Sequence, residues 1–122
     1  MEHYPQVYAE IKEAVVTKRP IYTMARCLDA VCKYYDVTKE EVKGRSREAH
    51  LITPRHHFCW VVYRNRIDIS YPMIGRFLGR DHTTIVHAVA KFNEYKCGMY
   101  RPRVERDVQN VDRLIHDMFT KS

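Results

Sequence analysis

Apolar side chains recur at helical spacing along most of this chain, in stripes that each occupy one face of a helix. The stripes cover residues 4–17, 21–35, 71–78 and 82–96, and a last stripe runs from 104 to 118 after a turn at 97–102. A run of six apolar residues, 58–63, would suit a buried strand equally well on its own. Because helical patterns surround that run, we predict an all-α fold, a compact domain of five to seven helices.

Local capping signals predict where several helices end. The stripe in 21–35 consists of Ile21, Met24, Ala25, Leu28, Val31 and Tyr35, so a helix is expected to begin near Ile21. Thr38 and Glu41 have the spacing of a capping box, which predicts a short helix that ends at Gly44. Thr53 followed by Pro54 resembles an N-cap with proline at the first helical position, so a central helix is expected to begin there.

Residues 71–92 are predicted to form two helices joined by a tight turn. Ser70 suits the N-cap of the first helix, and Gly79 supplies the permissive backbone that ends it. Gly75 leaves a small surface where a second helix can cross closely, and Asp81 suits the N-cap of that second helix. This spacing of small, glycine and β-branched residues is typical of a helix-turn-helix, whose second helix enters the major groove of DNA.

The second of these helices has an expected core face and an expected exposed face. Its core positions are Ile85, Ala88, Val89 and Phe92. Thr83, His87 and Ala90 point away from that core, and His82 and Thr84 flank them at the N-terminal end.

The positive charge of the chain is concentrated in its middle. Formal net charge is +6; residues 43–91 hold nine basic and three acidic side chains, whereas 1–42 and 92–122 balance at −1 and +1. Phosphate neutralisation with counterion release drives most nonspecific nucleic-acid affinity, so this localisation favours a polyanionic partner. A generally basic surface without a partner is the alternative.

Other function classes find little support in the sequence. The four cysteines form no Cys-x-x-Cys pair and are expected in the core, and the histidines lack the spacing of a zinc site. Asp81 and His82 are adjacent on a helix start and do not converge on a substrate. The chain has no membrane-spanning run, signal peptide or phosphate-binding loop. We therefore expect a cytoplasmic protein that is not an enzyme and uses no cofactor or metal.

Residues 79–88, Gly-Arg-Asp-His-Thr-Thr-Ile-Val-His-Ala, closely resemble the signature of the C-terminal DNA-binding domain of the bacterial replication initiator DnaA. The resemblance extends upstream through Arg45-Ser-Arg47 and Pro54-Arg55, and covers roughly residues 22 to 119. It implies a helix-turn-helix domain that binds double-stranded DNA.

The resemblance also implies a contact for each matching residue. Arg47, with Arg45 in the same basic loop, would enter the minor groove, where a guanidinium suits the narrow, electronegative groove of AT-rich sequence. Major-groove contacts would come from Arg80, Asp81, His82, Thr83 and Thr84. His87 and Lys91 would lie at phosphates further along the helix, and Arg55 would meet a phosphate or a base edge.

Other expected contacts, and one departure from the family, concern the helix starts and the turn. Backbone N–H groups at the helix starts near Ser70 and Thr53 could bind phosphates. His56 stands where the family usually has glutamine, and it can still donate one hydrogen bond. The turn from Gly75 to Arg80 is one residue shorter than the common Gly-Gly-Arg-Asp version, so we expect the fold to persist and the docking angle to differ.

The resemblance divides the chain into an N-terminal helical extension, residues 1–20, and a DnaA-like domain, residues 21–122. The extension is expected to pack on the domain; the alternative is an arm for a protein partner.

These features together predict a nucleoid-associated protein that binds AT-rich sites like the DnaA box and has no small-molecule substrate. A DnaA-like domain without the ATPase module suits a phage or mobile-element protein, or a regulator that competes with the host initiator of replication. One alternative is a helix-turn-helix transcriptional regulator on unrelated sites. The other is a protein-interaction module that has lost specific DNA binding.

Overall fold

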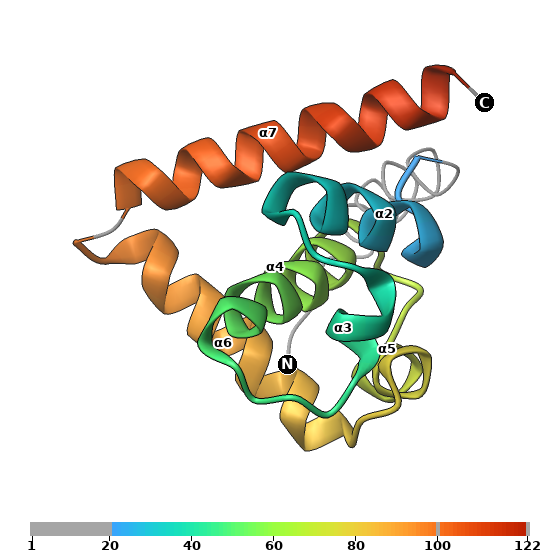
Figure 1. Ribbon diagram of the computed structural model, residues 1–122, viewed down its shortest axis with the longest axis vertical. Helices are drawn as coiled ribbons and strands as arrows, with labels where there is room; N and C mark the ends of the chain where they lie inside the picture. Colours follow the sequence, from blue (N-terminus) through green and yellow to red (C-terminus); the bar gives the residue numbers. More distant parts are fainter. Residues whose placement is uncertain (1–20, 100, 122) are drawn as a thin grey trace, which may run out of the picture.

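The computed structural model describes residues 21–99 and 101–121, which form six α-helices and no strand (Figure 1). They are α2 (Met24–Tyr35), α3 (Lys39–Lys43), α4 (Ala49–Asn65), α5 (Tyr71–Leu78), α6 (His82–Cys97) and α7 (Arg101–Thr120). The all-α prediction is confirmed. The helix predicted at 4–17 and the proposed extension 1–20 lie outside the described residues.

Helix α4 lies at the centre of the domain and contacts α2, α3, α5 and α6. Helix α7 packs across α2 and against α6 at the top of Figure 1, whereas α5 and the start of α6 lie at the opposite end. Each of these helices sends large side chains to the shared core, including Leu28, Phe58, Ile74, Phe92 and Ile115, all at most 1% exposed. Burial of this apolar surface holds the two ends of the molecule together.

The central helix begins earlier than predicted. Helix α4 starts at Ala49, so Thr53 and Pro54 lie inside it and do not form its N-terminus. Pro54 removes the N–H that would bond the carbonyl of His50, a residue on the exposed first turn. The additional turn buries Leu51, which is 1% exposed. Burial of one leucine, at about 1.5–3 kcal/mol, offsets a single lost hydrogen bond of about 1 kcal/mol.

Helix α2 begins at Met24, later than the predicted start near Ile21. The Thr23 hydroxyl accepts a hydrogen bond of 3.1 Å from the N–H of Arg26, and this N-cap sets the boundary. Ala25, predicted in the core stripe, is exposed.

Other local predictions are confirmed. In the capping box the Glu41 N–H donates to the Thr38 hydroxyl at 3.0 Å, and the Thr38 N–H donates to the Glu41 carboxylate at 2.8 Å. The run 58–63 lies within α4, which excludes the strand alternative. Gly79 ends α5 in the left-handed conformation, with φ 71°. Cys97 is exposed, so its predicted core position is wrong, whereas the other three cysteines are buried.

The turn between α5 and α6 folds back onto Gly75. The Arg80 N–H donates to the Gly75 carbonyl at 2.7 Å, and a Cβ on Gly75 would lie 2.5 Å from the Arg80 carbonyl oxygen. The predicted close approach at this glycine is therefore found, although the approaching group is the turn itself.

Candidate nucleic-acid interface

A buried arginine holds the loop formed by residues 44–48, called here the basic loop. Arg55 on α4 is 9% exposed, and its guanidinium donates to the backbone carbonyls of Glu41, Val42, Gly44 and Ser46. These charge-assisted bonds go to carbonyls at and just beyond the C-terminal end of α3, where the helix itself leaves carbonyl groups to be satisfied. The loop therefore presents the exposed side chains of Arg45 and Arg47 on a defined backbone.

Arg80 ties the helix-turn-helix to the same loop. Its guanidinium donates to the carbonyl of Gly44, and also to those of Lys43 at 3.4 Å and Leu78 at 3.3 Å. The Gly44 carbonyl thus accepts from both Arg55 and Arg80. Burial, together with the charge of Arg80, lowers the pKa of Arg55. Both guanidinium groups thus bond the protein backbone, and the DNA contacts expected of Arg55 and Arg80 stay predictions.

The first turn of α6 is polar and exposed. Asp81 has the extended backbone of an N-cap, but its carboxylate makes no capping bond and accepts a hydrogen bond from the Thr83 hydroxyl instead. That bond lowers the pKa of Asp81. The side chains of Asp81 and His82 are 66% and 56% exposed, and Thr83 and Thr84 are exposed as well. The turn therefore offers a carboxylate, an imidazole and threonine methyl groups to a partner.

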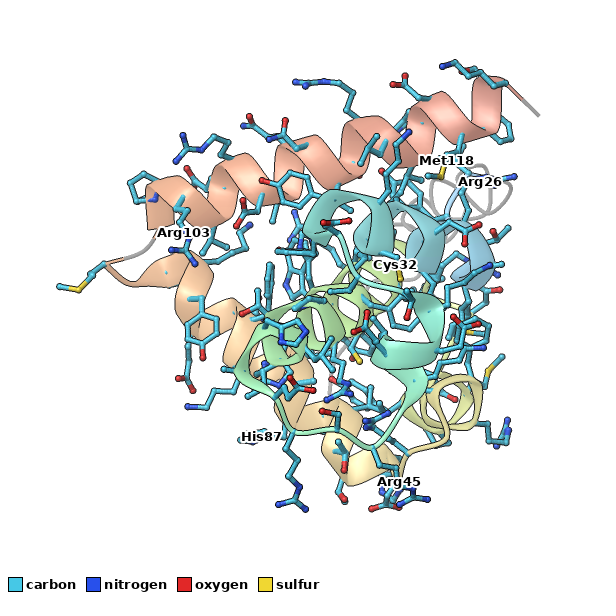
Figure 2. All side chains as sticks on the ribbon, viewed as in Figure 1. Arg26, Cys32, Arg45, His87, Arg103 and Met118 are labelled. Atoms are coloured by element: carbon cyan, nitrogen blue, oxygen red, sulfur yellow. The ribbon has the colours of Figure 1, made fainter. Side chains whose placement is uncertain are left out.

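A groove of about 620 Å³ lies between the basic loop, α4 and the start of α6. Eight of the predicted contact residues line it: Arg45, Arg47, Arg55, His56, Arg80, Asp81, Thr84 and His87. Four of these are arginines and one is a carboxylate, so the groove attracts anions. Figure 2 shows Arg45 and His87 at this end of the molecule, far from Arg26 and Met118 at the other end.

His56 is partly buried against α6. Its ring meets that of His87 edge-on, with centroids 6.3 Å apart, and its Nδ1 is buried without a hydrogen-bond partner. Burial first, and then the charges of His87, Lys91 and Arg55, lower the pKa of His56. An anion in the groove would oppose these effects and favour the protonated ring.

Three predicted contact residues of α6 do not line the groove, namely His82, Thr83 and Lys91. Thr83 is exposed on the adjacent turn, and Lys91 pairs with Glu94 at 3.6 Å. Exposed pairs of this kind contribute little stability, so Lys91 can exchange its partner for a phosphate at low cost.

The two helix starts predicted to bind phosphate have different outcomes. Ser70 caps α5, and its hydroxyl accepts a hydrogen bond of 3.4 Å from the N–H of Met73. Thr53 is half-buried inside α4 and lines a separate pocket near α7. The contact predicted for a helix start at Thr53 is therefore wrong.

Ile52 and Ser46 also line the groove, and the sequence did not point to either. Ile52 is 40% exposed although it is apolar. Because α4 was predicted to start at Thr53, Ile52 lay outside the predicted helix. Its position beside the groove could therefore not be predicted.

The family model for the helix-turn-helix of the bacterial DnaA protein matches residues 24–92, from the start of α2 to the last core residue of α6. The chain belongs to this family. The matched residues include the basic loop, helices α5 and α6 with the turn at Gly79, and the groove. The chain therefore carries a DNA-binding domain of the DnaA type.

Similar proteins are named chromosomal replication initiator protein DnaA. The protein from Thermoanaerobacter sp. strain X514 is 37% identical over 87 residues, which cover 70% of this chain and 19% of the relative. The protein from Leptospira biflexa strain Patoc 1 / Ames is 30% identical over 86 residues, with the same shares covered. The Levilactobacillus brevis protein is 33% identical over 84 residues, 68% of this chain and 18% of the relative. The chain thus spans about a fifth of the length of these relatives.

The turn between α5 and α6 closes through the left-handed Gly79 and the hydrogen bond from the Arg80 N–H to the Gly75 carbonyl. None of the helices in the described part of the chain combines the length and hydrophobicity that a bilayer crossing requires. Residues 21–99 and 101–121 also hold no group of three metal-ligating side chains.

Proposed function

We propose that this domain binds double-stranded DNA sequence-specifically, at AT-rich sites like the DnaA box. The first turn of α6 would read the major groove, and the basic loop would enter the adjacent minor groove. One observation carries the proposal: these two exposed segments border a single cation-lined groove, and Arg80 joins their backbones through the carbonyl of Gly44.

The predicted residues fall into two groups: those that would contact DNA and those that would hold the backbone in position. Arg45 and Arg47 would occupy the minor groove, where narrow AT-rich DNA attracts guanidinium groups. Base edges in the major groove would be read by Asp81, His82, Thr83 and Thr84. Phosphates would be contacted by His56, Ser70, His87 and Lys91. Arg55 and Arg80 would act as positioning residues, because they hold the basic loop and the turn in register.

A regulatory role fits these properties. The 122 residues contain no phosphate-binding loop for ATP, so they would occupy a site without unwinding it. We infer a non-catalytic protein that regulates replication initiation or competes with an initiator for its boxes, as a phage or mobile-element protein would.

Two rival functions use the same surface. A transcriptional regulator would bind unrelated sites with the same helix-turn-helix, and DNase footprinting on origin and promoter fragments would separate the two. A protein-interaction module would bind an acidic partner through the groove and would form no sequence-specific complex at physiological salt. The exposed polar set at 81–84 favours base reading, since a protein interface has no need for it.

The decisive experiment measures affinity for a duplex with a DnaA box and for a scrambled duplex by fluorescence anisotropy at several salt concentrations. Wild type is compared with Arg47→Ala and Thr83→Ala. A direct base contact is worth roughly 1–3 kcal/mol of discrimination, so Thr83→Ala should lose most of the preference for the box. Arg47→Ala should weaken binding and reduce the salt dependence.

Arg113→Ala on α7 is the matched control, because it removes one exposed positive charge at the opposite end of the domain. It should leave the preference for the box unchanged. Equal binding of both duplexes by wild type, with a steep salt dependence, would contradict box recognition and leave only electrostatic attraction.

A further inference from the structure

The outer face of α6 carries an apolar strip that the contacts proposed above leave largely unused. Val86 is 40% exposed, and it lies between the exposed residues Thr83 and Ala90 at helical spacing. These three side chains bear methyl groups in a line along the helix. The strip begins at the turn that we propose enters the major groove.

Packing within the domain does not account for Val86. The buried residues of α6 are Ile85, Ala88, Val89 and Phe92, which occupy the opposite face. A single exposed valine is ordinary on a protein surface. Here, however, Val86 follows directly after the turn of α6 that we propose contacts bases, and its side chain neither donates nor accepts hydrogen bonds. The apolar feature of the major groove that such a side chain can recognise is the 5-methyl group of thymine.

We propose that Val86 reads a thymine 5-methyl group in the DNA site, a role that rests on the proposed function of the domain. Three residues separate Thr83 from Val86, which is about 4.5 Å along a helix axis. Successive bases of one strand are about 3.4 Å apart. Val86 therefore meets a thymine about one base step beyond the base that Thr83 contacts. The short side chain of Ala90 allows the DNA to approach the helix closely at this point.

The test begins with selection of a preferred duplex from a random-sequence library by the full chain, so that it does not presume a DnaA box. Each thymine of the selected site is then replaced in turn by deoxyuridine, which removes only the 5-methyl group. Wild type and Val86→Ala are titrated against every duplex by fluorescence anisotropy. One deoxyuridine should weaken wild-type binding about fourfold, the value of one buried methyl, and should not weaken binding of Val86→Ala further.

Two variants control for indirect effects. Val86→Ala should fold, because alanine has the higher helix propensity, and circular dichroism checks this. Val86→Thr keeps the shape and replaces one methyl by a hydroxyl, so it gives a second, milder measurement. Thr83→Ser removes a methyl from the neighbouring position of the strip and should leave the deoxyuridine effect assigned to Val86 in place.

The outcomes separate this inference from the proposed function. If Val86→Ala responds to deoxyuridine at every position as wild type does, Val86 reads no methyl group, and sequence-specific binding still stands. If the selection yields no preferred sequence and methyl removal changes no affinity, both the inference and the proposed function are overturned.

Discussion

The four arginines around the groove differ in what their guanidinium groups contact. Arg55 and Arg80 donate to backbone carbonyls, whereas Arg45 and Arg47 are exposed on the loop that the other two hold. All four contribute positive potential to the groove. Arg55 and Arg80 bond the backbone whereas Arg45 and Arg47 extend from it, so the two pairs should respond differently to substitution.

Arg55→Lys should lower the free energy of unfolding by about 2–3 kcal/mol, because a lysine ammonium cannot span four carbonyls and leaves buried acceptors unsatisfied. Urea denaturation measures this change. Arg45→Lys, which makes the same substitution on the exposed loop, should leave stability unchanged. Equal stability of both variants and wild type would show that the bonds of Arg55 are not what holds the loop.

His57 should make the domain sensitive to acid. It is fully buried, its Nδ1 lies 2.7 Å from the Tyr35 hydroxyl, and burial lowers its pKa to about 3. In the unfolded chain this histidine takes up a proton near pH 6.5, whereas in the folded domain its ring stays neutral until the pH approaches 3. The free energy of unfolding therefore falls as pH drops from about 6.5 towards 3. Between pH 7 and pH 5 this group should cost about 2 kcal/mol.

Urea denaturation of wild type and His57→Gln at pH 7 and pH 5 checks that expectation. The variant should lose most of the difference between the two pH values. His82→Gln, on the exposed turn of α6, should keep it. An unchanged pH dependence in His57→Gln would assign the acid sensitivity to other groups.

His56 should link DNA binding to proton uptake. Its pKa is lowered in the isolated domain, and a phosphate nearby would raise it, so binding favours the protonated ring. Affinity should therefore rise as pH falls through the range in which the bound ring takes up its proton, by at most tenfold per pH unit for one proton. Anisotropy titrations from pH 7.5 to 5.5 measure the slope.

In the same titrations His56→Gln should show a shallower pH dependence, and the remote His116→Gln should match wild type. Identical slopes of affinity against pH for wild type and His56→Gln would show that no DNA phosphate lies near this ring.

At the scale of elements, the turn between α5 and α6 depends on two glycines for different reasons. A Cβ on Gly75 would meet the Arg80 carbonyl at 2.5 Å, whereas Gly79 has open space but a φ of 71°. Gly75→Ala should therefore cost about 2–3 kcal/mol through overpacking, and Gly79→Ala about 1 kcal/mol through backbone strain.

Thermal denaturation ranks the two variants, and Gly79→Asn should lose least, since asparagine tolerates the left-handed conformation. Because Gly75→Ala also displaces Arg80, it should weaken DNA binding as well. A larger loss for Gly79→Ala than for Gly75→Ala would contradict the packing at this turn.

Sequence patterns predicted the elements whose ends are set locally. The capping box at Thr38 and the glycine that ends α5 depend on neighbours within four residues, so the sequence displays them. The start of α4 depends on burial of Leu51 against the rest of the domain, and the Thr53-Pro54 signal pointed five residues too late, since the N-cap is Glu48. Tertiary burial outweighed a local preference there.

Across the whole molecule, four of the nine basic side chains in residues 43–91 line the groove at one end, while α2 and α7 cover the other end. The resemblance predicted that α6 and the basic loop contact DNA. It did not show that Arg55 and Arg80 are turned inward, because their partners are backbone carbonyls, which no side-chain pattern reveals. The groove itself appears only when three segments distant in sequence are assembled.

The Gly44 carbonyl, which accepts hydrogen bonds from Arg55 of α4 and Arg80 of the turn before α6, also limits which DNA sites can be bound. The basic loop and the first turn of α6 cannot slide apart, so they span one constant length. If both segments contact DNA as proposed, the protein would respond to the interval between two features of the DNA as well as to their chemistry. A single base pair inserted between those features would leave every base intact, and the two segments could then no longer contact both features at once.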